Sequence, residues 1–354
     1  MRYFDYSFLE HGMLPAGLVS VVGAISELRE RENKLKADYP DVFTRLESVA
    51  KVQSVKGSNE IEGIVTSEQR INEIVNQNSA PLNHNEAEIA GYRDALALIH
   101  SDYAALDVRE RDILRLHGIM LSYSSNVGDP SRTGGRYKDS DNVIMEIDAS
   151  GARRVRFEPT PATETAETME QLVLAYMDAR DNSAVNRLLL IPCFILDFLC
   201  IHPFADCNGR ISRLLSLLLL YKNGFDAGRY ISFEEQINRD KTGYYKALKD
   251  SSDGWHTGGN SYFPFIEGFV TTLLMCYKEL DKRFAVVNNG KVGKRERIEA
   301  TVLNSLLPIS KREVCYILPD VSPTTVEAVI ASMLKSGVIE KIGSARNTKY
   351  IRRK

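Results

Sequence analysis

The 354-residue chain is poor in cysteine, and no two of its five cysteines have the Cys-x-x-Cys spacing of a zinc ribbon. Their odd number also argues against the paired disulfide framework of a small secreted domain. Neither sign of charge is in excess, because the formal net charge is only −2. The composition therefore does not indicate a protein that coats nucleic acid, although a local basic patch remains compatible with it.

Long hydrophobic runs are absent as well. The most apolar stretch, 188–201, is interrupted by Pro192 and Asp197 and is shorter than the about 20 residues that span a bilayer. The first residues include an acid and have no apolar signal-peptide core. Apolar residues make up 44% of the chain and charged residues 26%, as in globular proteins. We expect a cytoplasmic protein of two or three domains with no membrane partner.

Three common catalytic fingerprints are missing: the P-loop GxxxxGK[ST], the dinucleotide-binding GxGxxG and the zinc-protease HExxH. Cys193 and Cys200 fall in a buried helical pattern, so we assign them to packing. Most histidines are scattered and form no evident ligand cluster (11, 84, 100, 117 and 256). The sequence thus excludes several familiar enzyme classes before any positive signal is considered.

Helical periodicity dominates the chain. Apolar residues recur at helical spacing in most of it (19–36, 42–55, 86–101, 107–121, 162–180, 185–201, 212–222, 239–249 and 262–284). A turn-rich stretch, 122–137, precedes two β-like segments that predict a hairpin over 142–157. The expected fold is therefore mainly α, with one small hairpin.

The C-terminal residues have a pattern of their own. Gly, Asn and basic residues in 287–295 predict a linker. Three helices and two short strands are expected after it (297–306, 311–316, 322–335, 338–342 and 348–351), with Gly337 ending the third helix. This order resembles a winged helix-turn-helix module. Its basic end would suit DNA phosphates, but such modules also dock proteins, so both partners stay open (Lys341, Arg346, Lys349, Arg352, Arg353 and Lys354).

The strongest chemical signal is a polar insert between two helices that are apolar almost all round. Residues 202–213 read His-Pro-Phe-Ala-Asp-Cys-Asn-Gly-Arg-Ile-Ser-Arg. Pro203 ends the first helix near His202, and Gly209 allows close backbone approach. The second helix starts near Arg210 with unpaired N–H groups, which bind anions. Arg210 and Arg213 share one face there, opposing the helix dipole unless an anion is bound.

These features predict a site for a polyphosphate with a divalent metal. Asp206 could hold Mg²⁺, which uses one or two carboxylates plus phosphate oxygens. His202 could accept a proton. A helix stop and a surface arginine pair would be the simpler explanation, but burying such charges without partners is costly.

Residues 202–213 resemble the HPFx(D/E)GNGRxxR signature of Fic-domain proteins, with Cys207 as the one departure, at a glycine position. If that position needs a positive φ, Cys207 adds strain. The family is mainly α-helical, with a β-hairpin flap. Its members typically transfer AMP from ATP to a hydroxyl of a target protein with Mg²⁺, and release pyrophosphate.

The resemblance implies roles for individual residues. His202 would be the base, Asp206 would hold Mg²⁺, and Arg210 and Arg213 would contact the α/β- and γ-phosphates. The hairpin 142–157 would hold the main chain of the target by strand addition. The remaining implied nucleotide-binding residues line the phosphates or lie near the adenine (Phe204, Ala205, Cys207, Asn208, Gly209, Tyr244 and Tyr245).

A second motif lies upstream. Ser58-Asn-Glu-Ile-Glu62-Gly63 matches the (S/T)xxxE(G/N) inhibitory helix of Fic proteins, in the N-terminal position of the class II arrangement. The resemblance implies that Glu62 pairs with Arg213 and takes the place of the γ-phosphate, since a carboxylate resembles that anion.

The expected organisation has four parts: an N-terminal helical region with the inhibitory motif (1–105), the Fic core (106–286), the linker (287–295) and a winged-helix-like domain (296–354). The expected function is an autoinhibited protein adenylyltransferase that modifies a Tyr, Ser or Thr of a target or of itself. Two alternatives stay open: removal of AMP, with Glu62 positioning a water, and a nucleotide-sensing DNA-binding regulator without turnover. A homodimer also stays open.

Overall fold

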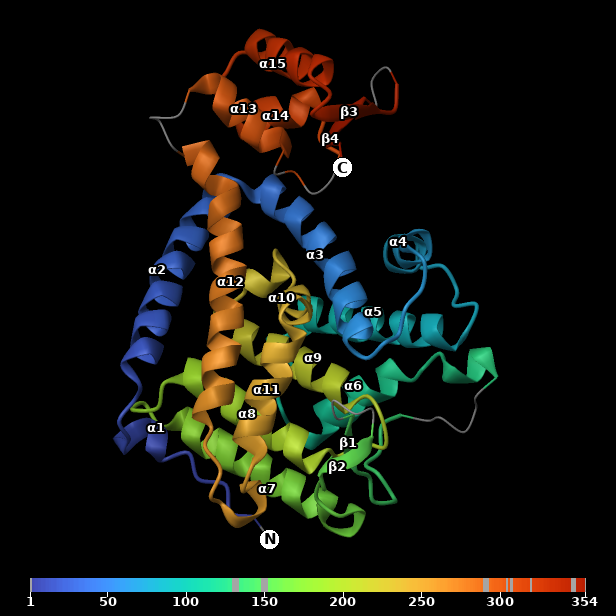
Figure 1. Cartoon of the computed structure of the whole chain (residues 1–354), viewed down its shortest axis with the longest axis vertical. Helices are drawn as coiled ribbons and strands as arrows, with labels where there is room; N and C mark the ends of the chain where they lie inside the picture. Colours follow the sequence, from blue (N-terminus) through green and yellow to red (C-terminus); the bar gives the residue numbers. More distant parts are fainter. Residues whose placement is uncertain are drawn as a thin grey trace.

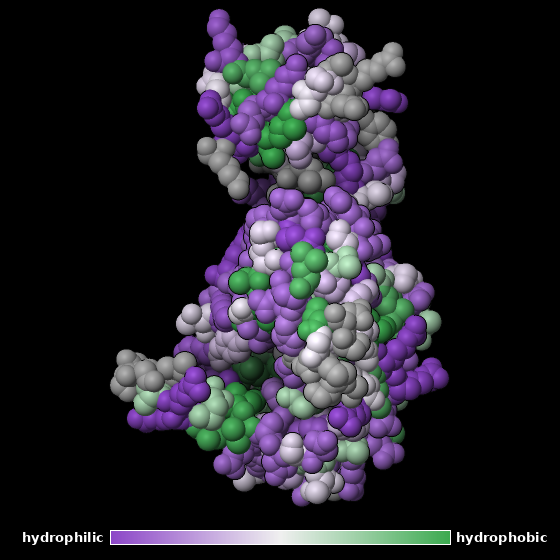
Figure 2. Space-filling view, turned by 90° about the vertical axis from the view of Figure 1, so that its right-hand side faces the viewer, coloured by the Kyte–Doolittle hydropathy of each residue, from purple (hydrophilic) through white to green (hydrophobic). Residues whose placement is uncertain are grey.

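The structure is a computed structural model that describes residues 2–128, 134–147, 152–288, 293–303, 305, 308–318, 320–344 and 348–353. A large helical body carries a smaller C-terminal unit, and the two meet at a narrow waist (Figures 1 and 2). The face in Figure 2 is largely hydrophilic, with small separate hydrophobic patches. Among the described residues, no helix combines the length and apolarity needed to cross a bilayer.

The N-terminal third forms the helices that the periodicity predicted, together with two that it did not. The expected helices are α2 (Ala16–Asp38), α3 (Pro40–Ile61), α5 (His84–Asp102) and α6 (Glu110–Met120). The unexpected ones are the single turn α1 (Phe8–His11) and α4 (Glu68–Gln77). The helix α4 buries only Ile71 and Ile74, so its apolar stripe is too thin for periodicity to reveal. The side chain of Ser67 caps its N-terminus.

The middle of the chain builds the centre of the body. Strands β1 (Ile144–Ile147) and β2 (Arg153–Phe157) pair antiparallel, as predicted; the predicted turn 148–151 lies outside the described residues. The helices that follow are α7 (Ala162–Asp181), α8 (Arg187–Ile201), α9 (Asn208–Lys222), α10 (Phe233–Arg239), α11 (Lys241–Ser252) and α12 (Phe263–Asn288). Three short 3₁₀ turns complete the body: η1 (Ser124–Val127), η2 (Ala227–Arg229) and η3 (Trp255–Thr257).

Helices α8 and α9 lie at the heart of the body (Figure 1), as their uniform apolarity predicted. Every residue of α8 after Arg187 is buried. The helix α9 begins at Asn208, earlier than the apolar pattern suggested, because the first turn of α9 consists of the polar insert itself. The loop between the two helices is therefore held rigidly at both ends by core packing.

The C-terminal unit has its own small apolar core, with Ile298, Val314 and Val326 fully buried. It consists of α13 (Lys294–Leu303), α14 (Lys311–Ile317), α15 (Pro323–Lys335), β3 (Ile339–Ile342) and β4 (Lys349–Arg352). The two strands pair antiparallel. Gly337 has φ +71° just after α15, which agrees with the predicted end of that helix.

The predicted linker 287–295 overlaps helix at both ends. The helix α12 runs to Asn288 and α13 begins at Lys294, while 289–292 lie outside the described residues. The body also contacts the C-terminal unit through the start of α3. Tyr39 and Val42 pack against its apolar core, and Arg45 lies 2.9 Å from Glu313 in an ion pair.

Candidate active site

The polar insert forms a tight loop between α8 and α9. His202 ends α8 in the left-handed conformation, with φ +53°, while its N–H still donates to the Phe198 carbonyl. The Asn208 side chain closes the loop from the other side. Its Oδ1 accepts from the Phe204 N–H at 2.9 Å and its Nδ2 donates to the Phe204 carbonyl at 2.7 Å.

Cys207 occupies a backbone conformation that favours glycine. Its φ is +69° at the N-terminus of α9, so the strain that the sequence made conditional on a positive φ is present. The position has compensating contacts. The Cys207 N–H donates to Asp206 Oδ1 at 2.6 Å, and Arg210 donates to the Cys207 sulfur at 3.1 Å. The sulfur thus packs within the loop rather than projecting from it.

A cavity of about 850 Å³ opens over this loop. Many of the residues singled out from the sequence line it (Glu62, His202, Ala205, Asp206, Cys207, Asn208, Gly209, Arg210 and Tyr245). The hairpin forms part of its wall through Ile144, Met145, Arg156 and Phe157. The structure therefore brings the loop, the upstream motif and the predicted flap together around one space.

Five predicted residues do not line this cavity. The Phe204 ring is fully buried and stacks on His117, with ring centroids 3.8 Å apart. Tyr244 lines a separate cavity and packs edge-on against Tyr245. The other three are the buried Ser58 and Arg213 and the exposed Gly63. Phe204 and Tyr244 thus contact the site through the packing of their neighbours.

His202 is held as a neutral imidazole. Its Nδ1 lies 3.2 Å from the Leu199 carbonyl oxygen, and because a carbonyl only accepts, Nδ1 carries the hydrogen and Nε2 keeps its lone pair. Burial lowers the pKa of His202 to about 4, with nearby Lys138 adding to the effect. At neutral pH the ring can accept a proton at Nε2.

Arg213 is buried and bound by the upstream motif. Its Nε donates to Ser58 Oγ at 2.8 Å, and its terminal nitrogen lies 2.7 Å from Glu62 Oε1. The predicted pairing of Glu62 with Arg213 is therefore confirmed. Burial alone would raise the pKa of Glu62, but Arg213, Arg210 and Lys241 outweigh it, so the pKa falls and the carboxylate is ionised.

Arg210 has a carboxylate partner that sequence reasoning missed. It forms a buried ion pair with Glu88 of α5 and donates to Asn59 Oδ1 of α3 at 3.3 Å. Glu88 also pairs with His84 at 2.8 Å, one helical turn away. Nothing in the local sequence around Glu88 marks it, because only the packing of α5 against α9 places it beside Arg210.

The end of α3 fits closely against the loop. A Cβ at Gly209 would lie 2.5 Å from Glu62 Oε1, so a larger residue there would force this carboxylate to move. Lys241 of α11 donates its Nζ hydrogen to the carbonyl of Ile61, directly before Glu62. A cation at a helix C-terminus is favourable, so α11 helps to hold the end of α3, with Glu62, in place.

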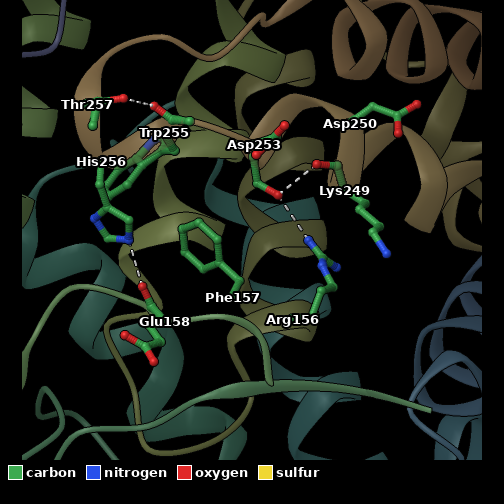
Figure 3. Close-up of a pocket in the computed structure, with 11 residues that line it drawn as sticks. Arg156, Phe157, Glu158, Lys249, Asp250, Asp253, Trp255, His256 and Thr257 are labelled. Carbon is green, nitrogen blue, oxygen red and sulfur yellow. Dashed lines mark hydrogen bonds between the residues drawn. The ribbon is translucent and has the colours of Figure 1, made fainter. Parts of the chain in front are cut away.

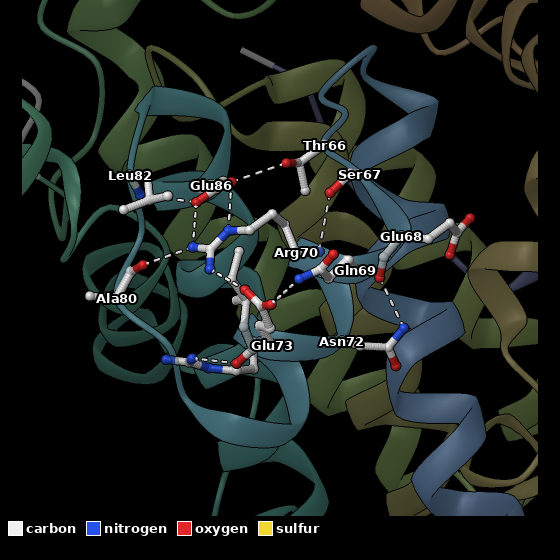
Figure 4. Close-up of polar contacts among 12 residues, drawn as sticks. Thr66, Ser67, Glu68, Gln69, Arg70, Asn72, Glu73, Ala80, Leu82 and Glu86 are labelled. Atoms are coloured by element: carbon white, nitrogen blue, oxygen red, sulfur yellow. Dashed lines mark hydrogen bonds and ion pairs between the residues drawn. The ribbon is translucent and has the colours of Figure 1, made fainter. Parts of the chain in front are cut away.

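The chain after Glu62 is anchored by a second set of charges, shown in Figure 4. Arg70 of α4 lies 2.7 Å from the buried carboxylate of Glu86 in α5. Glu86 also accepts from the Thr66 hydroxyl at 3.0 Å and the Leu82 N–H at 2.9 Å. Hydrogen bonds from Arg70 lower the pKa of Glu86, which keeps it ionised. These contacts tie the segment between α3 and α5 to the body.

A second cavity of about 710 Å³ shares Arg156, Phe157 and Ser252 with the first. Figure 3 shows Phe157 beside the ring of His256, where the two stack with centroids 5.2 Å apart. Arg156 donates to Ser252 Oγ at 3.1 Å. The β2 strand therefore separates two adjoining cavities.

The residues also fit a divalent cation in one place. Donor atoms of Glu88, Asp206 and Cys207 lie within 4.8 Å of one another. Carboxylate oxygens suit Mg²⁺ and a thiolate does not, so Asp206, exposed in the cavity, is the residue that matches this ion best.

The candidate site is thus a polar loop between two buried helices, and comparison with known proteins shows which family has this arrangement. Residues 106–220 match the model of the Fic/DOC family. A Fido domain-containing protein of Dictyostelium discoideum is 31% identical over 110 residues, which are 31% of this chain and 71% of that protein. The chain belongs to the Fic/DOC family.

Solved structures share the fold at low identity. A Fic family protein from Desulfovibrio desulfuricans G20 has a TM-score of 0.61 and 19% identity, over 96% of this chain and 97% of its own. A Fic domain-containing signaling protein from Bacteroides thetaiotaomicron has a TM-score of 0.59 and 21% identity, over 73% and 96%. Fic-1 from C. elegans, residues 134–508, has a TM-score of 0.56 and 17% identity, over 74% and 71%. Members of this family typically transfer AMP to target proteins.

Proposed function

We propose that this protein is an autoinhibited adenylyltransferase that transfers AMP from ATP to a Tyr, Ser or Thr hydroxyl of a target protein or of itself. The observation that carries the proposal is the meeting of His202, Asp206 and Arg210 in one cavity, where Glu62 reaches the buried Arg213. The same cavity is walled by the hairpin, which we propose as the docking strand for the target.

The proposed reaction uses these groups directly. His202 Nε2 takes the proton from the acceptor hydroxyl as its oxygen attacks the α-phosphorus. The bond from the α-phosphorus to the bridging oxygen breaks, and pyrophosphate leaves. Arg210 and the N–H groups at the start of α9 stabilise the charge on the phosphates. Asp206 would hold Mg²⁺, which would neutralise phosphate charge.

Autoinhibition would follow from competition for Arg213. A γ-phosphate and the Glu62 carboxylate are both anions, and Arg213 can pair fully with only one of them at this site. While Glu62 stays paired, ATP would bind with its α-phosphate misplaced relative to His202. Loss of only about 1 Å of alignment can reduce a rate by about 100-fold.

The test uses the full chain and ATP labelled in the α-phosphate. We expect Glu62→Gly to raise protein labelling, and His202→Ala in that background to abolish it. We expect Glu62→Gln to raise labelling too, and Glu60→Gln is its matched control, because Glu60 lies on the same helix end but pairs with Lys56 and accepts from Asn238. Equal labelling with and without His202 would contradict the proposal, and equal labelling by Glu62→Gln and Glu60→Gln would contradict the autoinhibition.

Removal of AMP is a second candidate, favoured by one observation: the Glu62 carboxylate itself lines the cavity and is ionised. There it could orient a water for attack on an AMP–protein bond. Wild type would then release AMP from a modified target, whereas Glu62→Gly would not. Faster release of AMP by Glu62→Gly than by the wild type would contradict this candidate and favour AMP transfer as the activity.

A third candidate is a nucleotide-sensing regulator that binds DNA without turnover. The strained φ of Cys207 and the basic C-terminal hairpin favour it. ATP binding by Glu62→Gly without labelling, together with specific DNA binding, would support this candidate over both enzymatic ones.

A further inference from the structure

The backbone carbonyls of residues 201–204, at the start of the loop that carries His202, face the short segment 138–142, which precedes the hairpin. Lys138 Nζ donates to the Ile201 carbonyl at 3.2 Å, and the Lys138 N–H donates to the Pro203 carbonyl at 2.9 Å. Asn142 Nδ2 donates to the Phe204 carbonyl at 3.0 Å and lies 3.5 Å from the His202 carbonyl oxygen. Residues 201–204, with His202 among them, are thus held from outside their own loop.

Lys138 and Asn142 also hold each other. Lys138 Nζ donates to Asn142 Oδ1 at 2.8 Å, which turns the Asn142 amide so that its Nδ2 meets the loop. Lys138 is only 5% exposed, and burial lowers its pKa to about 8. A desolvated ammonium of this kind is costly unless its contacts are specific, and those contacts are the last-turn carbonyl of α8 and the Asn142 amide.

The same segment leads directly into the hairpin. Asn142 stands two residues before β1, and Asp141 accepts from the Ala162 N–H at the start of α7. The five residues 138–142 therefore connect the hairpin to the loop carbonyls through hydrogen bonds. A helix C-terminus left without these donors would have unpaired carbonyls and a freer His202.

We propose that Lys138 and Asn142 are positioning residues, which clamp the backbone of the loop that carries His202 to the base of the hairpin. A target strand docked on the hairpin would then be held in register with the imidazole. The kinetic part of this inference rests on the proposed function; the clamp itself does not. Neither residue is expected to touch ATP, because neither lines the cavity.

The kinetic test compares variants of the full chain in the Glu62→Gly background. Lys138→Met keeps the length of the side chain but loses its three donors, and Lys138→Arg keeps donors. We expect Lys138→Met to lower kcat by about 10- to 100-fold with KM for ATP nearly unchanged, and Lys138→Arg to recover most of kcat. Ser140→Ala is the matched control, since this exposed side chain bonds to Asp139 and to no other described residue.

Hydrogen exchange separates the clamp from the chemistry. We expect the amides of the loop, that of Phe204 above all, to exchange at least about 10-fold faster in Lys138→Met than in Ser140→Ala. This readout needs no enzymatic activity, so a parent that transfers no AMP would contradict the proposed function and still leave the clamp to be decided. Unchanged loop exchange, or an unchanged kcat in an active parent, would overturn the inference.

Asn142→Ala serves as a second variant where Lys138→Met proves too unstable to purify. Asn142 is half-buried and uncharged, and after its replacement by Ala the Lys138 ammonium still donates to the Ile201 carbonyl. We expect a smaller fall of kcat, about 5- to 20-fold, again at constant KM. A rise in KM without a fall in kcat would show nucleotide binding rather than positioning, and would overturn the inference.

Discussion

Cys207 shows how one residue can suit the chemistry of a loop and oppose its backbone. Its φ of +69° costs a residue with a Cβ about 1–2 kcal/mol relative to glycine. The sulfur accepts a hydrogen bond from Arg210 inside the loop, so the side chain also makes a contact that glycine could not make. The position therefore combines a backbone strain with a contact to a cation of the candidate site.

A pair of substitutions separates these two effects. Both Cys207→Gly and Cys207→Ala remove the sulfur, but only Cys207→Gly removes the Cβ. We expect the free energy of unfolding of Cys207→Gly to exceed that of Cys207→Ala by about 1 kcal/mol, so Cys207→Gly should unfold at a higher temperature. Thermal unfolding of the two variants measures this, and equal stability would show that the loop relaxes to a negative φ.

His202 should remain neutral well below the pH at which a free histidine protonates. Burial disfavours the charged ring and lowers its pKa to about 4, so the nucleotide-free protein should show no titration of this residue between about pH 5.5 and 8. The ring resonances in NMR spectra across that range provide the measurement. A midpoint for His202 within that range would contradict the burial.

At the scale of the element, α2 carries a carboxyl group, that of Glu32, which is buried in the folded protein. Glu32 is 2% exposed, and Lys36 Nζ lies 3.4 Å from its Oε1. Burial raises the pKa of Glu32 to about 8, Asp226 adds to the rise and Lys36 opposes it. The folded protein therefore keeps this proton at a pH where the unfolded chain has lost it.

This difference makes stability fall as pH rises. Below the unfolded pKa of Glu32 both states hold the proton, and between about pH 5 and 8 only the folded state does. Glu32→Gln should remove that slope, stabilising the protein by up to about 4 kcal/mol at pH 8 and little at pH 4.5. Denaturant unfolding at both pH values, with the exposed Glu30→Gln as control, checks this. A gain that is the same at both pH values would exclude ionisation as its cause.

The helix α3 has a different role at the same scale, because its two ends belong to different parts of the molecule. Its first turns pack on the C-terminal unit through Val42 and Arg45, and its last turn carries Ser58 to Arg213. Gly57 lets it approach α10, where a Cβ would lie 3.2 Å from the Glu235 nitrogen. One continuous helix thus spans the distance from the C-terminal unit to the candidate site.

At the scale of the whole molecule, the C-terminal unit presents two faces of different charge. The exposed side of α15 is nearly neutral, with Glu327 and Lys335 as its charged residues among small neutral ones. The hairpin of β3 and β4 exposes cations instead (Lys341, Lys349, Arg352 and Arg353). A phosphate backbone would therefore favour the hairpin over α15.

We expect binding of the full chain to duplex DNA to depend on that hairpin and to weaken with salt. Replacing Lys349 and Arg352 by Glu, which reverses their charge, should abolish a low-salt mobility shift. With fewer cation–phosphate contacts, binding releases fewer counterions from the DNA and is therefore weaker. Glu327→Lys should leave the shift in place. The absence of any shift for the unaltered chain at low salt would contradict DNA binding and favour a protein partner.

The sequence was most informative where structure depends on neighbours along the chain. Periodicity predicted α2, α3, α5 to α9, α11, α12 and the paired strands, because amphipathic spacing and turn residues are local. It missed α4, whose apolar stripe is thin, and the short helices α1 and α10. The pairing of Glu62 with Arg213 came from a resemblance to a family, since no rule of spacing links residues 151 positions apart.

By itself the sequence determined the chemistry of the loop, because the imidazole, carboxylate, glycine and arginines of the candidate site all lie within 202–213. Only the tertiary structure decided which groups meet them. Glu88 reaches Arg210, Lys138 and Asn142 reach the loop carbonyls, and the ring of Phe204 turns into the core. Such contacts depend on how distant helices pack, and packing is set by the shape of the whole core rather than by any local run of residues.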